Sequence, residues 1–64
     1  MDKPFGPESA AAHIKKHLLS PGQLQLMRIH GLPTGDEAET LTRLCGFTVN
    51  VFVYGRGVYR VTRA

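Results

Sequence analysis

The sequence predicts one small α+β domain in which two or three short helices pack on a C-terminal antiparallel β-hairpin. Three observations lead to this prediction. The chain has 64 residues, which is room for a single domain. Helix start and stop signals recur through its first two thirds, and β-branched and aromatic residues dominate its last third. With 42% hydrophobic and 20% charged residues, the composition is typical of a globular chain rather than a disordered one.

The first predicted helix follows a flexible N-terminal arm, residues 1–6 (MDKPFG), so that the domain comprises residues 7–64. Proline has no N–H to lose in the first turn of a helix, and a carboxylate there complements the helix dipole, so Pro7 and Glu8 suit that turn. The apolar stripe expected on this helix consists of Ala10, Ala11, Ile14 and Leu18.

Two further helices are predicted from capping-box signals. Residues 20–23 (SPGQ) start one helix, which Gly31 and Pro33 end. Residues 34–37 (TGDE) start another, which ends at Gly46. The apolar positions of these two helices are Leu24, Met27, Ala38, Leu41, Leu44 and Cys45.

The hairpin is predicted from residues 48–54 (TVNVFVY) and 58–62 (VYRVT), which flank a Gly-Arg-Gly turn. A two-residue loop would pair Val53 with Val58, whereas a three-residue loop with a left-handed Gly57 would pair Tyr54 with Val58. The second register is favoured because it separates apolar from polar side chains better. It places Val49, Val51, Val53, Tyr59 and Val61 on the inner face, and Asn50, Phe52, Tyr54, Val58, Arg60 and Thr62 on the outer face. The predicted core is this inner face together with Ile14, Leu18, Leu24, Met27, Leu41 and Leu44.

This order of elements resembles the winged helix-turn-helix family of DNA-binding proteins. The resemblance implies that the second and third helices form the helix-turn-helix, that the third lies in the major groove, and that the hairpin is the wing. It implies that Thr40, Thr42 and Arg43 face the bases. The segments LSPGQLQLMRIHGL, DEAETLTRLCG and YGRG also resemble Cro/repressor-type regulators of phages, which would need a helix over residues 49–54.

A basic hairpin is the main indication of function. Residues 46–64 contain no acid, and Arg56, Arg60 and Arg63 could anchor phosphates. Lys15 and Lys16 would extend the basic surface. The first hypothesis is therefore a small DNA-binding transcriptional regulator of winged-helix type, with duplex DNA as its partner and a second copy as a candidate partner, because one small module buries little surface on DNA.

The alternative is a small phage- or plasmid-type accessory protein that binds and modulates a host protein without nucleic acid. Its contact surface would be formed by Phe52, Tyr54 and Arg60, since aromatic residues and arginine are enriched at protein interfaces.

Catalysis, a cofactor and a structural metal are not expected. His13 and His17 share a helix face, but only His30 and Cys45 remain as further ligands and no Cys-x-x-Cys pair is present. Cys45 falls at a helical core position and is expected to be buried. We also expect no membrane partner and a cytoplasmic location, because the chain has no long apolar stretch, no signal-like apolar segment and no disulfide pair.

Overall fold

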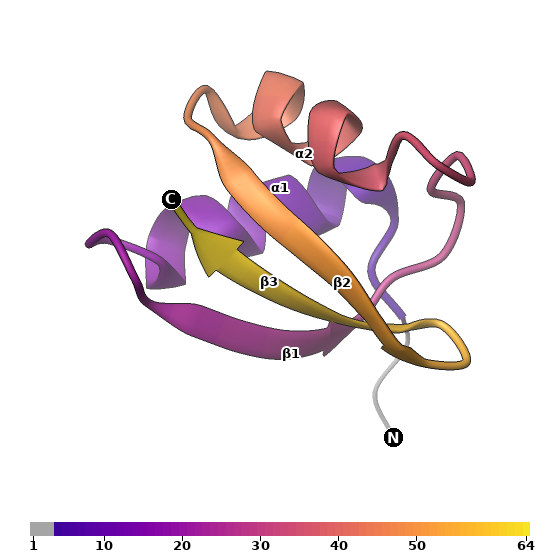
Figure 1. The fold of residues 1–64 in the computed structure, drawn as a ribbon. Helices are drawn as coiled ribbons and strands as arrows, with labels where there is room; N and C mark the ends of the chain where they lie inside the picture. The colour runs from indigo at the N-terminus through magenta and orange to yellow at the C-terminus, as the bar shows by residue number, and fades with distance from the viewer. Residues whose placement is uncertain (1–3) are drawn as a thin grey trace.

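The computed structural model describes residues 4–64 and forms the predicted α+β fold with a C-terminal hairpin (Figure 1). It has two helices and three strands. In chain order they are α1 (Pro7–His17), β1 (Leu24–Arg28), α2 (Glu37–Cys45), β2 (Val49–Gly55) and β3 (Val58–Arg63).

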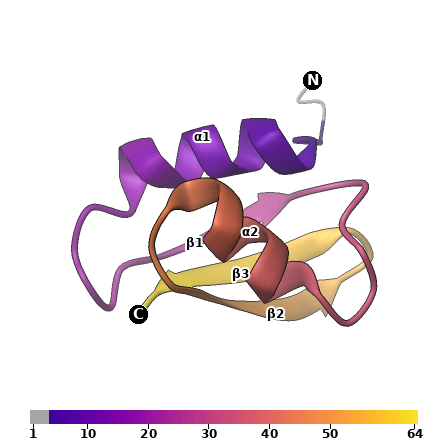
Figure 2. The ribbon, with the colours of Figure 1, turned by 90° about the horizontal axis from the view of Figure 1, so that it is seen from above.

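The strands form one antiparallel sheet in the order β1-β3-β2, so the last strand of the chain is the central one. Both helices lie on the same side of this sheet (Figures 1 and 2). Phe5, within the segment predicted as a flexible arm, pairs in parallel with Ile29 just after β1. Its N–H donates to the carbonyl of Arg28 at 2.8 Å, and its carbonyl accepts from the N–H of His30 at 2.8 Å. The rest of the predicted arm, residues 1–3, lies outside the described residues.

The ends of both helices follow from local sequence. Pro7 occupies the first turn of α1, and Leu18 ends that helix by donating its N–H to the carbonyl of Ile14. Gly46 ends α2 in the left-handed conformation (φ 86°), with its N–H donating to the carbonyl of Thr42. This is the stop predicted for a glycine after the last helical turn.

The prediction of a helix starting at residues 20–23 is wrong, because the chain turns there and continues as strand β1. Half of the expected capping box is present: the side-chain Oε1 of Gln23 accepts from the N–H groups of Ser20 (2.8 Å) and Leu19 (2.6 Å). Gly22, however, has a φ of +89°, which turns the chain out of a helical path. Since a strand replaces the second helix, residues 4–64 contain no helix-turn-helix of the kind on which the winged-helix resemblance was based.

The hairpin has the predicted register. Val51 lies opposite Val61 and Val53 opposite Tyr59, as expected for the three-residue loop. Gly57 is left-handed (φ 64°), also as expected. The difference is at the tip, where Gly55 rather than Tyr54 lies opposite Val58 and the ladder is irregular between Val53 and Gly55. A helix over residues 49–54, which a Cro/repressor-type fold would need, does not form.

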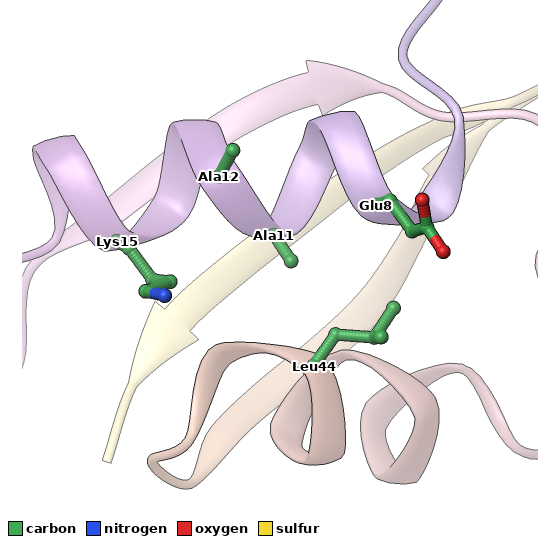
Figure 3. Close-up of a pocket in the computed structure, with 5 residues that line it drawn as sticks. All are labelled: Glu8, Ala11, Ala12, Lys15 and Leu44. Atoms are coloured by element: carbon green, nitrogen blue, oxygen red, sulfur yellow. The ribbon is translucent and has the colours of Figure 1, made fainter.

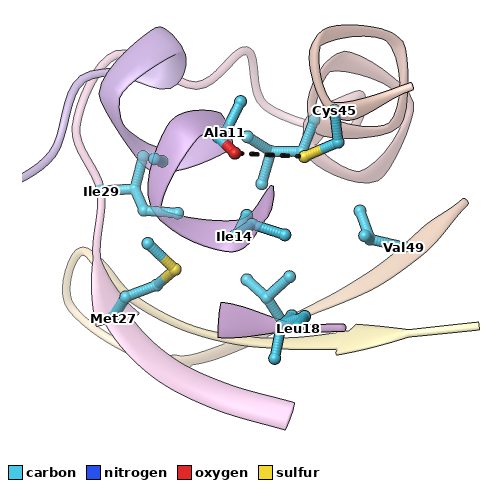
Figure 4. Close-up of a cluster of buried hydrophobic side chains, with 10 residues drawn as sticks. Ala11, Ile14, Leu18, Met27, Ile29, Cys45 and Val49 are labelled. Atoms are coloured by element: carbon cyan, nitrogen blue, oxygen red, sulfur yellow. Dashed lines mark hydrogen bonds between the residues drawn. The ribbon is translucent and has the colours of Figure 1, made fainter. Parts of the chain in front are cut away.

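The core lies between the sheet and the two helices (Figure 4). The structure contradicts three core predictions. Leu24 is 55% exposed because it lies on the uncovered side of β1, Leu44 is 40% exposed on α2, and Val53 is 70% exposed beyond the helical layer. Val51 and Tyr59 are half-buried. The buried apolar residues are Ala10, Ala11, Ile14, Leu18, Met27, Ile29, Leu41, Cys45, Val49 and Val61.

Leu41 and Leu44 provide a matched test of this core. Leu41 is fully buried, so Leu41→Ala should reduce the free energy of unfolding by about 2–5 kcal/mol, through lost burial and the cavity left behind. Leu44→Ala should reduce it much less, because Leu44 is partly in solvent already. Urea unfolding followed by circular dichroism measures both changes, and equal losses would contradict the observed packing.

Candidate functional site

The side of the sheet away from the helices is not covered by any described helix. Side chains alternate between the two sides of a strand, so the residues between the buried ones point outward. Among them Leu24, Leu26 and Phe52 are each about half exposed. We call this surface the open sheet face, and it consists of Leu24, Leu26 and Arg28 of β1, Val58, Arg60 and Thr62 of β3, and Asn50 and Phe52 of β2.

The middle row of the open sheet face places an arginine between two large apolar side chains. Leu26 lies opposite Arg60, and Arg60 lies opposite Phe52 on the other side. The guanidinium carbon of Arg60 is 5.2 Å from the centre of the Phe52 ring, which is a cation–π contact. Tyr54, at the irregular end of β2, is exposed beside this surface. Phe52 and Arg60 therefore share the outward side of the hairpin, as the favoured register predicts.

The charges on this face are all of one sign. Neither β1, β2 nor β3 contains an acidic residue. In the described part of the chain, the acids lie in the helical layer and its loops. Glu39 pairs with Arg43 at 3.0 Å, and the Glu37 carboxylate accepts from the N–H of Gly35 at 3.1 Å. Arg28 and Arg60 consequently have no carboxylate partner on the open sheet face.

Arg63 lies apart from the other hairpin arginines. Its side chain donates a hydrogen bond to the carbonyl of Leu18 at 3.0 Å, and its guanidinium carbon is 4.0 Å from the centre of the Phe47 ring. Leu18 follows the last residue of α1, so its carbonyl has no helical hydrogen-bond partner, and the arginine satisfies it. Arg56, by contrast, is exposed at the hairpin tip.

The residues predicted from the winged-helix resemblance lie on α2, on the other side of the sheet. The Thr42 hydroxyl accepts from the N–H of Val49 at 3.0 Å and is 3.5 Å from the carbonyl oxygen of the same residue. Arg43 forms the ion pair with Glu39, and Thr40 is half-buried. Lys15 and Lys16 are exposed on α1. The predicted site residues are thus divided between the helical layer and the sheet, and the structure brings together only Phe52 and Arg60, with Tyr54 exposed beside them.

Six residues of the open sheet face were not predicted as site residues: Leu24, Leu26, Arg28, Asn50, Val58 and Thr62. Leu24 and Leu26 were assigned to a helix, and Leu24 to the core. The alternation of β1 could have identified them, since an outward leucine pair would follow once residues 24–28 were recognised as a strand.

Two titratable groups near the core have altered pKa values. Burial lowers the pKa of His13, the positive charge of His17 lowers it further, and the neighbouring Gln25 side chain opposes the change. The rings of His13 and His17 lie with their centres 4.2 Å apart and their planes tilted by 36°. Burial raises the pKa of the Cys45 thiol, which lies 3.8 Å from the carbonyl of Ala11. Cys45 is a buried core residue, as predicted.

A shallow groove separates α1 from α2 (Figure 3). Its volume is about 200 Å³, below the roughly 300–1,000 Å³ of typical small-molecule pockets. Glu8 and Lys15 carry its charges, and the alanines of α1 and Leu44 provide its apolar lining. This groove contains no pair of side chains arranged for nucleophilic or acid–base chemistry.

Within residues 4–64, no three histidine, cysteine or acidic side chains come close enough together to hold a metal ion. None of the described helices has the length and apolar character needed to cross a membrane. Comparison with protein-family models, with curated proteins and with solved structures finds no match for this chain.

Arg63 and Arg56 test which arginine of the hairpin supports the fold. Arg63→Ala removes the hydrogen bond to the Leu18 carbonyl and the contact with Phe47, so it should lower the free energy of unfolding by about 1–3 kcal/mol. Arg56→Ala, at the exposed tip, should change it by less than about 0.5 kcal/mol. Thermal and urea unfolding compare the two variants, and similar effects would rule out the proposed role of Arg63.

His13 should make the fold less stable in mild acid. Its folded pKa lies below the unfolded value of 6.5, so protonation favours the unfolded chain. The free energy of unfolding should therefore fall as the pH drops below about 6.5. His13→Gln should weaken this dependence between about pH 7 and pH 5, whereas His30→Gln, at an exposed loop position, is the matched control. An unchanged slope in His13→Gln would refute the assignment.

Proposed function

We propose that the protein is a small binding module whose open sheet face docks a partner protein carrying acidic and apolar side chains. A small accessory protein that modulates a host protein would work in this way. One observation supports the proposal above the others: half-exposed Leu26 and Phe52 flank Arg60 on a surface without any acid. Exposed apolar patches with aromatic residues and arginine are typical of protein interfaces.

The chemistry of Arg60 defines the partner. A docked protein would cover the leucines and Phe52, and it would remove water from the guanidinium between them. A desolvated arginine needs hydrogen-bond acceptors, and a carboxylate matches its geometry with two parallel bonds. The partner should therefore place an aspartate or glutamate over Arg60 and apolar side chains around it. Arg28, on the same face, would attract the same kind of surface.

Binding of duplex DNA is a second candidate, because Arg28, Arg56 and Arg60 lie on strands or a turn without acids. The expected contacts would be to phosphates, which give affinity that depends on salt rather than on base sequence. A base-reading role for Thr42 and Arg43 has less support, since both side chains are engaged within the fold.

Selection from a display library of short random peptides tests the first proposal. Peptides that bind the unmodified protein should be enriched in acidic and aromatic residues. Arg60→Glu should weaken their binding by roughly tenfold or more, because it places a like charge against the peptide carboxylate. Arg43→Glu, which makes the same charge change on α2, should leave binding unchanged. Fluorescence polarisation measures these affinities.

Peptides without acidic enrichment, or equal effects of the two variants, would refute the acidic partner. The DNA candidate is checked in parallel by titrating duplex DNA over a range of salt concentrations. If it is correct, Arg56→Ala combined with Arg60→Ala should reduce the salt slope by about 2, since each lost phosphate contact removes about 1. If the protein does not bind duplex DNA at low salt, DNA binding is excluded as its function.

A further inference from the structure

Strand β2 forms one edge of the sheet, and it lacks the charged residues and prolines that usually protect an edge from pairing with another chain. Its sequence, VNVFVYG, contains no charged residue and no proline. Edge strands normally carry such residues, or are covered, because their free N–H and carbonyl groups are a template for another strand. At the opposite edge of the sheet, Phe5 pairs beside the end of β1.

The free backbone groups of β2 are confined to its middle. Successive residues of an antiparallel strand direct their backbone groups alternately to the two neighbours. The Thr42 hydroxyl bonds the backbone N–H and carbonyl of Val49 on the side of β2 away from β3. By this alternation, the backbone N–H and carbonyl groups of Val51 and Val53 point to the same side. At the far end, Gly55 closes the hairpin opposite Val58. Val51 and Val53 therefore offer their backbone groups to a further strand.

The side chains at this edge are also left open. Val53 belongs to the side of the sheet that the helices cover, yet it is 70% exposed, and the adjoining Val51 is only half-buried. A strand added here would bury both valines. The middle of the β2 edge therefore combines apolar side chains with unpaired backbone groups. Helix α2 covers only the start of this strand, at Val49.

We propose that this edge binds the same edge of a second copy of the chain, joining two sheets into one of six strands. The two β2 strands would run antiparallel about a twofold axis. The register that uses all the free groups places Val51 opposite Val53 of the second copy, and Phe52 opposite its own counterpart. Pairing Val51 with its own counterpart instead would require Val49 to release the Thr42 hydroxyl.

The absence of charge on β2 makes a second copy of the chain a suitable partner for this edge. Because β2 is uncharged, two copies meet without repulsion. The arginine opposite Phe52, Arg60, is one strand away, so the two Arg60 side chains would be separated by three strand spacings, roughly 14 Å. That exceeds the screening length of about 8 Å at physiological salt. The open sheet face stays uncovered in this dimer and continues from one copy to the other.

Cysteine cross-linking tests the register. In a Cys45→Ala background, Phe52→Cys should oxidise completely to a disulfide-linked dimer, because the two residues 52 would be a non-hydrogen-bonded pair with Cα atoms about 4.5 Å apart. Asn50→Cys is the matched control on the same strand and the same face. Residue 50 would lie roughly 14 Å from its counterpart, too far for a disulfide, so it should give no dimer above background. Similar cross-linking of the two variants would overturn the proposed register.

Sedimentation equilibrium of the unmodified protein tests the dimer itself. Val53→Lys should convert the dimer to a monomer while retaining the circular dichroism spectrum, since residue 53 is largely in solvent in one copy. Leu19→Lys, at a similarly exposed position after α1, should leave the dimer intact. A monomer throughout the concentration range would overturn the proposal. That result would leave the acidic-peptide experiment unaffected, because the dimer forms through the backbone edge at Val51 and Val53, whereas the peptide contacts the side chains of the open sheet face.

Discussion

Two short helices cover one side of a three-stranded sheet, and this coverage determines how the rest of the molecule is arranged. The helices contribute Ala10, Ile14 and Leu41 to the core, and the sheet contributes Met27 and Val61. Once these side chains are buried against one another, the other side of the sheet has no layer from residues 4–64 to cover it. A chain of this size buries only about 60% of the surface its unfolded form exposes. The remaining apolar surface is concentrated on the sheet, where it can contact another molecule.

Two side-chain hydrogen bonds to backbone groups at the ends of a helix and a strand connect the helical layer to the sheet. The Thr42 hydroxyl ties α2 to the start of β2, and Arg63 ties β3 to the last turn of α1. Both side chains were predicted to contact DNA, and in the fold each satisfies backbone groups that regular structure leaves unpaired. Their engagement in the fold separates them from Arg60, whose guanidinium group lies over the Phe52 ring on the open sheet face. The arginines of the hairpin thus differ in role although they lie close together in sequence.

The sequence predicted the elements that depend on local signals. The hairpin register followed from apolar alternation and from Gly57, and the end of α2 followed from Gly46. Strand β1 could not be recognised in this way. The residues around Ser20 carry a capping-box pattern whose hydrogen bonds can form in a turn as well as at a helix start. Strand β1 forms because it pairs with β3, which lies more than thirty residues later in the chain. The same long-range pairing explains why Leu24 and Leu26 were missed on the open sheet face.

The position of β3 affects how the chain folds as it is synthesised. Strands β1 and β2 do not pair with each other, and each forms its sheet hydrogen bonds with β3, which is synthesised after both. Until then the nascent chain has no sheet, and its uncharged β2 segment is free to associate with other exposed strands. A chaperone that shields this segment during translation would raise the yield of folded protein. Adding a lysine or proline near the middle of β2 would lessen the need for such a chaperone.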